Sequence, residues 1–209
     1  MNAQTVRKVV HGPAGDIECA VDQPESAARG TAIICHPHPQ GGGSLDNKVV
    51  QTLARSMVQL GWCSVRFNFR GVGASQGAWA DGEGEIDDAL AVIEATRDPA
   101  LPWLLAGFSF GGFVAAEAAR RLPERDRPQR IVLVAPSTQK LVVPTVPADT
   151  LVIHGDADDI VPLSATLEWA RPQALPVVVL PGVGHFFHGQ LGLLKSVLLQ
   201  QLPAPGLAP

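Results

Sequence analysis

Residues 103–116 read WLLAGFSFGGFVAA, and this stretch decides the fold. Its first four residues are apolar and typical of a strand, and its last four suit a helix, so GFSFG occupies the turn between them. A serine at the tip of such a sharp turn projects its oxygen above the edge of a sheet. Glycine is expected at 107 and 111 because a Cβ there would collide with the neighbouring helix or strand. Ser109 is therefore a candidate nucleophile.

Length and composition describe one large core. The chain has 209 residues, of which 46% are hydrophobic and 17% charged. This length predicts a single domain over residues 1–209, with the Pro-rich end, 203–209, as a flexible tail. The formal net charge is −4, and the two signs are interspersed. Neither nucleic acid nor an anionic membrane is therefore expected as a partner.

Cysteine usage and the N-terminal residues predict a cytoplasmic protein. The three cysteines (Cys19, Cys35 and Cys63) are an odd number without paired spacing, which favours a reducing compartment. The first fifteen residues contain no apolar stretch typical of a signal peptide. No run approaches the ~20 apolar residues of a membrane span.

Strand-like and helix-like segments alternate along the chain, which predicts an α/β fold. Apolar strands that are each followed by a helix indicate a mostly parallel sheet with helices on both faces, here of about eight strands. The first two strands are short and joined at HGPAG, which suits an antiparallel hairpin at the sheet edge. We expect strands over 7–10, 17–21, 31–35, 63–69, 103–106, 130–134, 150–154 and 177–180. We expect helices over 47–60, 84–96, 110–121, 163–170 and 189–202.

A serine nucleophile at neutral pH needs a base, and the base needs an acid that orients it. On a strand–turn–helix scaffold of this kind the acid and the base follow the serine in that order, each just after a strand. His185 follows the strand over 177–180 through a Gly-Val-Gly turn, and we expect it to be the base. After the strand over 150–154, three carboxylates compete for the role of acid: Asp156, Asp158 and Asp159.

Acyl transfer also needs two N–H donors for the oxyanion that forms. We expect the first from Phe110, the residue after the nucleophile. The second is expected from the loop CHPHPQGGG over 35–43, in which the prolines have no N–H. His36 and His38 in this loop have the spacing of a metal pair, but no third ligand with metal-like spacing follows. We therefore expect neither a metal nor a cofactor.

Five segments carry a resemblance to a known family: HPHPQGGG, FNFRGVGAS, GFSFGG, HGDADDIVP and GVGHFF. In this order, over about residues 17–200, they resemble small bacterial α/β-hydrolases near the dienelactone-hydrolase and Xaa-Pro-peptidase-like groups. The resemblance implies the α/β-hydrolase fold. True dienelactone hydrolases have cysteine at the position of Ser109, so a lactone substrate is not expected.

The resemblance also implies site residues. The family's catalytic aspartate stands four residues after the histidine of HGDADDIVP, which selects Asp158, with Asp156 as the second choice and Asp159 as a cap of the following helix. The second oxyanion N–H falls on His38, which corresponds to the residue after the His-Gly pair of many members. Gln40 is the alternative.

The segment FNFRGVGAS is interpreted as structural, with Arg70 holding the loop.

Many lipases and dehalogenases insert a cap domain after the sixth strand, but here only residues 136–149 are available, and three of them are proline. We therefore expect no cap and an open, shallow site. The candidate walls of this site are four aromatic residues: Phe110, Phe113, Phe186 and Phe187. Of these, Phe113 and Phe186 are the substrate-binding choices. For Phe186 and Phe187 the alternative is a position in the core.

Together these features predict a serine hydrolase that acts through an acyl-enzyme. The expected substrate, and the expected partner, is a small ester with a short acyl chain, which makes the protein a carboxylesterase. A thioesterase, peptidase or acyltransferase with the same three residues is an alternative. A binding protein that keeps the fold without catalysis is another, because a fold alone does not imply an activity.

Overall fold

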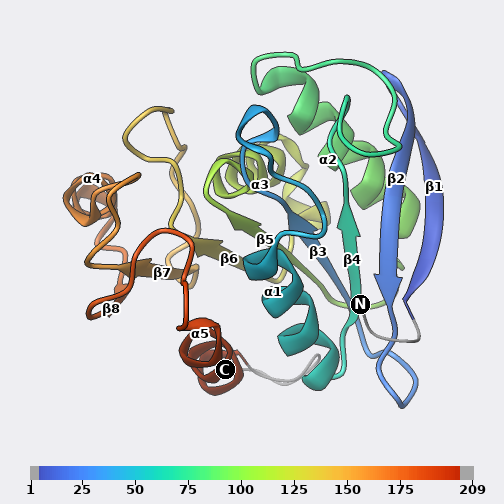
Figure 1. The fold of residues 1–209 in the computed structure, drawn as a ribbon. Coiled ribbons are helices and arrows are strands. Elements are labelled where there is room, and N and C mark those ends of the chain that lie inside the picture. Colours follow the sequence, from blue (N-terminus) through green and yellow to red (C-terminus); the bar gives the residue numbers. More distant parts are fainter. Residues whose placement is uncertain (1–4, 203–209) are drawn as a thin grey trace.

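The structure is a computed structural model that describes residues 5–202. One eight-stranded sheet runs through it in the order β1-β2-β4-β3-β5-β6-β7-β8 (Figure 1). The antiparallel hairpin of β1 and β2 forms one edge, and β2 also pairs antiparallel with β4, whereas all the later pairs are parallel. The strands are β1 (Val6–Gly12), β2 (Gly15–Asp22), β3 (Thr31–Cys35), β4 (Cys63–Phe67), β5 (Trp103–Phe108), β6 (Arg130–Val134), β7 (Leu151–Gly155) and β8 (Val177–Leu180).

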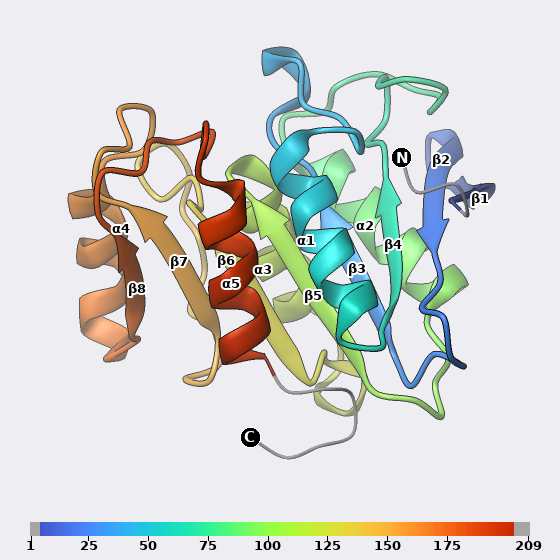
Figure 2. The same cartoon turned by 60° about the horizontal axis from the view of Figure 1, so that its bottom comes forward.

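Helices cover both faces of this sheet. On one face α1 packs against α5, and both lie in front of the sheet in Figure 2. On the other face α2 packs against α3, and α4 lies beside β7 and β8 at the far edge. The helices are α1 (Lys48–Gln59), α2 (Glu83–Thr96), α3 (Phe110–Arg121), α4 (Leu163–Ala170) and α5 (Leu191–Gln201).

Successive side chains of each strand point to opposite faces of the sheet, and this divides the core into two layers. On β3, Ala32 and Ile34 face α1 and α5, whereas Ile33 and Cys35 face α2 and α3. Both sets are completely buried. Strands buried on both faces read as continuous apolar runs, and this is why the sequence predicted a parallel sheet.

The α/β class, the strand number and the edge hairpin are confirmed. The element ends differ by a few residues. The strand expected to end at Ala106 continues to Phe108. The strand expected to reach Phe69 ends at Phe67, because the N–H of Phe69 donates to Nε2 of His36 rather than to a neighbouring strand. The expected tail over 203–209 lies outside the described residues.

The segment between β6 and β7, residues 135–150, contains neither helix nor strand. No cap domain is therefore inserted at this point, as predicted. Among residues 5–202, every helix is too short or too polar to cross a membrane. The three cysteines are free thiols, with Cys19 and Cys35 buried and Cys63 half-buried.

Candidate active site

Ser109 lies between the last residue of β5 and the first residue of α3. Its backbone has φ +55° and ψ −118°, a conformation that L-residues rarely adopt. Two neighbours hold it there, since its N–H donates to the carbonyl of Val134 at 2.9 Å and its carbonyl accepts from Gly112 at 2.9 Å. The turn is therefore sharp, strained and fixed by hydrogen bonds.

The glycines two positions before and after Ser109 are a steric requirement. A Cβ added at Gly107 would lie 2.0 Å from the carbonyl oxygen of Gly111. A Cβ added at Gly111 would lie 2.3 Å from the carbonyl oxygen of Cys35 and 2.5 Å from that of His36. Both collisions are with backbone atoms, which cannot rotate away. The second shows that the loop after β3 presses directly against the turn that carries Ser109.

Three side chains that are far apart in the sequence meet at the carboxyl ends of the strands. Nε2 of His185 lies 3.0 Å from Oγ of Ser109, and Nδ1 of His185 lies 2.7 Å from Oδ2 of Asp158. Ser109 follows β5, Asp158 lies in the loop after β7 and His185 in the loop after β8. The structure thus brings together the expected nucleophile, acid and base in one hydrogen-bonded chain. All three are buried, with 4–7% of each residue exposed.

Asp158 is held as a carboxylate. Its Oδ1 accepts hydrogen bonds from the N–H groups of Ile160 at 2.9 Å and Val161 at 2.8 Å. Burial raises the pKa of Asp158, but the contacts with His154 and His185 and the N–H of Val161 outweigh it and hold this pKa well below 3.8. The carboxylate is therefore ionised at neutral pH and able to hold the Nδ1 proton of His185.

The other two aspartates of this loop lie elsewhere. Oδ1 of Asp156 accepts a hydrogen bond from the N–H of Gly182 at 2.6 Å, so this side chain ties the loop after β7 to the loop after β8. Asp159 is exposed, and the expectation that it caps the next helix is wrong. The residue at the cap position of α4 is Pro162, and no side chain caps that end. The helix begins at Leu163, four residues after Asp159.

The expected oxyanion donors are the N–H groups of Phe110, the residue after Ser109, and of His38. Phe110 is the first residue of α3, and His38 precedes the short 3-10 turn Pro39–Gly41. Within residues 5–202 neither N–H has a hydrogen-bond acceptor. The ring centroids of His38 and Phe110 are 5.1 Å apart, which places the loop after β3 next to the first turn of α3. Gln40, the alternative donor, lies further into the turn and is exposed.

The side chain of His36 fixes the loop after β3 through hydrogen bonds of both ring nitrogens. Its Nδ1–H donates to the carbonyl of Pro37 at 2.6 Å, and its Nε2 accepts from the N–H of Phe69 at 3.1 Å. Burial lowers the pKa of His36 from 6.5 to about 4. Because both ring nitrogens are engaged, His36 offers no lone pair to a metal. Among the described residues, no group of three or more His, Cys, Asp or Glu side chains is arranged to hold a metal ion.

The four candidate aromatic walls separate into core and surface. Phe187 is completely buried beside Phe108, which confirms the core alternative for this residue. The ring of Phe110 is also buried, against Phe69 and Trp79. Phe186 is 47% exposed.

The rings that remain at the surface of the site are Phe186 and Phe113. The ring of Phe186 lies edge-on to His185 at 5.1 Å. Phe113 is half-buried beside Phe110, with ring centroids 6.0 Å apart. Trp79, which the sequence analysis missed, is half-buried 4.6 Å from the ring of His38. Its only sequence signal is that it is a lone aromatic residue in a glycine-rich loop.

Ser137 is a second residue that the sequence analysis missed. Its N–H donates to the carbonyl of Ser109 at 3.2 Å, and its Oγ lies 3.4 Å from Oγ of Ser109. It follows β6, the strand next to β5. A polar residue just after the carboxyl end of a neighbouring parallel strand is the signal that would have found it.

Arg70 holds its loop, as predicted. Its guanidinium binds both carboxylate oxygens of Asp88 on α2, at 2.7 and 3.0 Å, and its own N–H donates to the same carboxylate at 2.9 Å. Asp88 is completely buried. This ion pair raises the pKa of Arg70 and joins the loop after β4 to α2.

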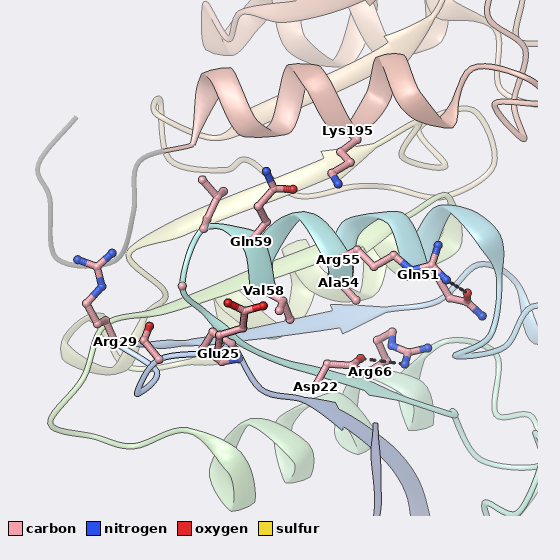
Figure 3. Close-up of a pocket in the computed structure, with 14 residues that line it drawn as sticks. Asp22, Glu25, Arg29, Gln51, Ala54, Arg55, Val58, Gln59, Arg66 and Lys195 are labelled. Atoms are coloured by element: carbon pink, nitrogen blue, oxygen red, sulfur yellow. Dashed lines mark hydrogen bonds and ion pairs between the residues drawn. The ribbon is translucent and has the colours of Figure 1, made fainter. Parts of the chain in front are cut away.

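A hollow of about 830 Å³ lies apart from this site, between α1, α5 and the segment after β2 (Figure 3). Ser109, Asp158 and His185 are not among its lining residues. Arg66 and Asp22 form an ion pair of 2.9 Å there, and Arg29 and Arg55 lie near the C-terminal half of α1. Arg55 is itself a residue of α1, and its guanidinium donates to the Gln51 side chain at 3.1 Å.

The fold and the grouped Ser109, Asp158 and His185 define a lidless α/β serine hydrolase. A family model described as serine aminopeptidase, S33, matches residues 27–144, and the chain belongs to this family. An uncharacterized protein of Rickettsia prowazekii is 32% identical over 160 residues. The match covers 72% of this chain and 66% of that protein, so the chain spans slightly less than two thirds of that relative's length.

Solved structures agree with this assignment. An α/β serine hydrolase without a lid from Xanthomonas campestris is 39% identical, with a TM-score of 0.90 over 100% of this chain and 99% of that one. An α/β serine hydrolase homologue from Coxiella burnetii is 36% identical, with a TM-score of 0.85 over 94% of this chain and 97% of that one.

Proposed function

We propose that this protein is a carboxylesterase that hydrolyses small esters with short acyl chains through an acyl-enzyme. The observation that carries the proposal is the continuous hydrogen-bonded chain from Asp158 through His185 to Ser109. In this arrangement the carboxylate holds the imidazole with its proton on Nδ1, which leaves the Nε2 lone pair for the Ser109 hydroxyl.

The reaction proceeds in two steps. In the first, His185 takes the proton of Ser109 while Oγ attacks the ester carbonyl, and the N–H groups of Phe110 and His38 stabilise the oxyanion. The intermediate collapses as His185 gives the proton to the leaving alcohol. In the second step, water loses a proton to His185, attacks the acyl-enzyme and releases the acid, and the proton returns to Ser109. No cofactor takes part.

The preference for short chains rests on the open site. Residues 135–150 contain no helix that folds over Ser109, so a long acyl chain would remain largely in water. Two aromatic surfaces remain for a small acyl or alcohol group, the half-buried ring of Phe113 and the exposed ring of Phe186. The family description favours peptides as the second class of substrate, since the same three residues also cleave amides.

The test is the hydrolysis of p-nitrophenyl esters of increasing acyl length, with aminoacyl p-nitroanilides and acyl thioesters alongside. We expect acetate and butyrate esters to turn over, the rate to fall with chain length, and Ser109→Ala to abolish it. Faster cleavage of the anilides would move the assignment to a peptidase. If no substrate reacts and a fluorophosphonate probe does not label Ser109, the fold serves binding and the proposal is wrong.

A further inference from the structure

His154 is a buried histidine that the proposed reaction does not use. It lies one residue before the end of β7 and four residues before Asp158, and none of its surface is exposed. Its Nε2 lies 2.8 Å from the carbonyl oxygen of Val161 and 3.4 Å from Oδ2 of Asp158. Its Nδ1 has no hydrogen-bond partner among the described residues.

These contacts decide which nitrogen carries the proton. A carbonyl oxygen only accepts, so the short contact with Val161 requires a hydrogen on Nε2. The Nε2–H therefore points to the carbonyl of Val161, and Oδ2 of Asp158 lies 3.4 Å from the same nitrogen. Nδ1 faces no acceptor. His154 is therefore a donor through Nε2 alone.

Val161 connects this donor to the acid a second time. Its N–H donates to Oδ1 of Asp158, while its carbonyl accepts from His154. The turn over residues 158–161 is thus fixed by two hydrogen bonds of Val161, one through its N–H and one through its carbonyl. Oδ2 of Asp158, which accepts the hydrogen bond of the His185 Nδ1–H, also lies 3.4 Å from Nε2 of His154. A change at His154 would loosen the turn and remove a polar contact from this oxygen.

We propose that His154 is a positioning residue that sets the orientation of the Asp158 carboxylate toward His185, an inference that rests on the proposed serine hydrolase chemistry. It touches neither the nucleophile nor the expected substrate position. It acts through Asp158, by the direct contact with Oδ2 and by the Val161 turn. Outer partners that orient a reacting group typically change rates by about 10- to 100-fold.

Two substitutions separate this role from simple filling of the core. His154→Gln places an amide N–H close to the position of Nε2 and preserves the donor. His154→Asn places its amide close to the position of Nδ1, which has no partner, and loses the donor. Both introduce a polar amide of a residue smaller than histidine, so the comparison isolates the position of the N–H. Ser109→Ala is the reference for lost chemistry.

The measurements are kcat and KM for p-nitrophenyl butyrate, the thermal midpoint, and the proton NMR signal of the His185 Nδ1–H. We expect His154→Asn to lower kcat about 10- to 100-fold with KM within about twofold. We expect its Nδ1–H signal to broaden or vanish. His154→Gln should keep the signal and restore kcat to within about threefold of the wild type.

A role limited to stability predicts a different pattern. Both variants would then melt at lower temperature, with kcat of the folded protein and the Nδ1–H signal unchanged, and this result would overturn the inference. If the wild type hydrolyses the ester and Ser109→Ala does not, the proposed function stands whatever His154 does. If the wild type is inactive, the NMR signal alone decides, and a sharp signal in His154→Asn overturns the inference.

Discussion

Asp158 lies 2.7 Å from the ring of His185, although 27 positions separate the two residues in the chain. Asp156, two residues earlier, binds the N–H of Gly182 instead. We therefore expect Asp158→Asn to lower kcat by about 10⁴-fold, because the amide favours the wrong tautomer of His185. Asp156→Asn should keep kcat within about threefold of the wild type. Steady-state kinetics on the two variants checks this, and the opposite order would make Asp156 the acid.

Gly111 has no room for a side chain, whereas none of the described residues lies within 4 Å of a Cβ added at Gly192. Gly111→Ala should destabilise the protein by about 1–3 kcal/mol and reduce kcat, because the loop after β3 must move away from Ser109. Gly192→Ala, in α5, should raise stability by about 0.5–1 kcal/mol, because alanine favours a helix over glycine. Chemical denaturation of both variants measures the difference, and equal effects would show that the turn tolerates movement.

His36 should make stability depend on pH. Its pKa is about 4 in the folded protein and 6.5 without the burial. As the pH falls, His36 therefore binds a proton in the unfolded chain before it does so in the folded protein. Its contribution to the free energy of unfolding is complete above pH 6.5 and is lost as the pH falls toward 4. The loss is about 3 kcal/mol. In urea denaturation at pH 7, 5.5 and 4, His36→Asn should lose less stability over this interval than the wild type. Parallel curves would mean that His36 is not buried in its neutral form.

Phe186 and Phe187 are neighbours with opposite surroundings. Phe187→Ala should destabilise the protein by about 3–5 kcal/mol, because a completely buried ring leaves a cavity. Phe186→Ala should change stability by less than about 0.5 kcal/mol, because its ring is 47% exposed. If Phe186 forms a substrate wall, this second variant raises KM for p-nitrophenyl butyrate. Thermal denaturation with kinetics measures both effects, and an unchanged KM would remove Phe186 from the binding surface.

The fold could be predicted because its constraints are local. The two glycines around Ser109 are required by backbone contacts inside one strand–turn–helix unit, so the sequence of that unit carries the signal. His185 could be predicted because it follows the last strand directly through a glycine-rich turn. Apolar runs buried on both faces marked the parallel strands in the same way.

Other parts of the site depend on contacts between segments that are distant in the sequence. Asp156 binds the N–H of Gly182, and Asp158 binds His185, both in the loop after β8. Phe187 turns into the core through a backbone with φ +54°, which residue type alone does not indicate. Ser137 approaches Ser109 only because β6 pairs with β5. These relationships follow from the assembled sheet.

The absence of a helix between β6 and β7 has a kinetic consequence. Lipases with a mobile cap show interfacial activation, in which the rate jumps when the substrate forms droplets that pull the cap open. Residues 135–150 have no helix to be displaced in this way. Dissolved monomers and emulsified esters should therefore meet the same Ser109, and turnover should saturate smoothly through the solubility limit of the ester.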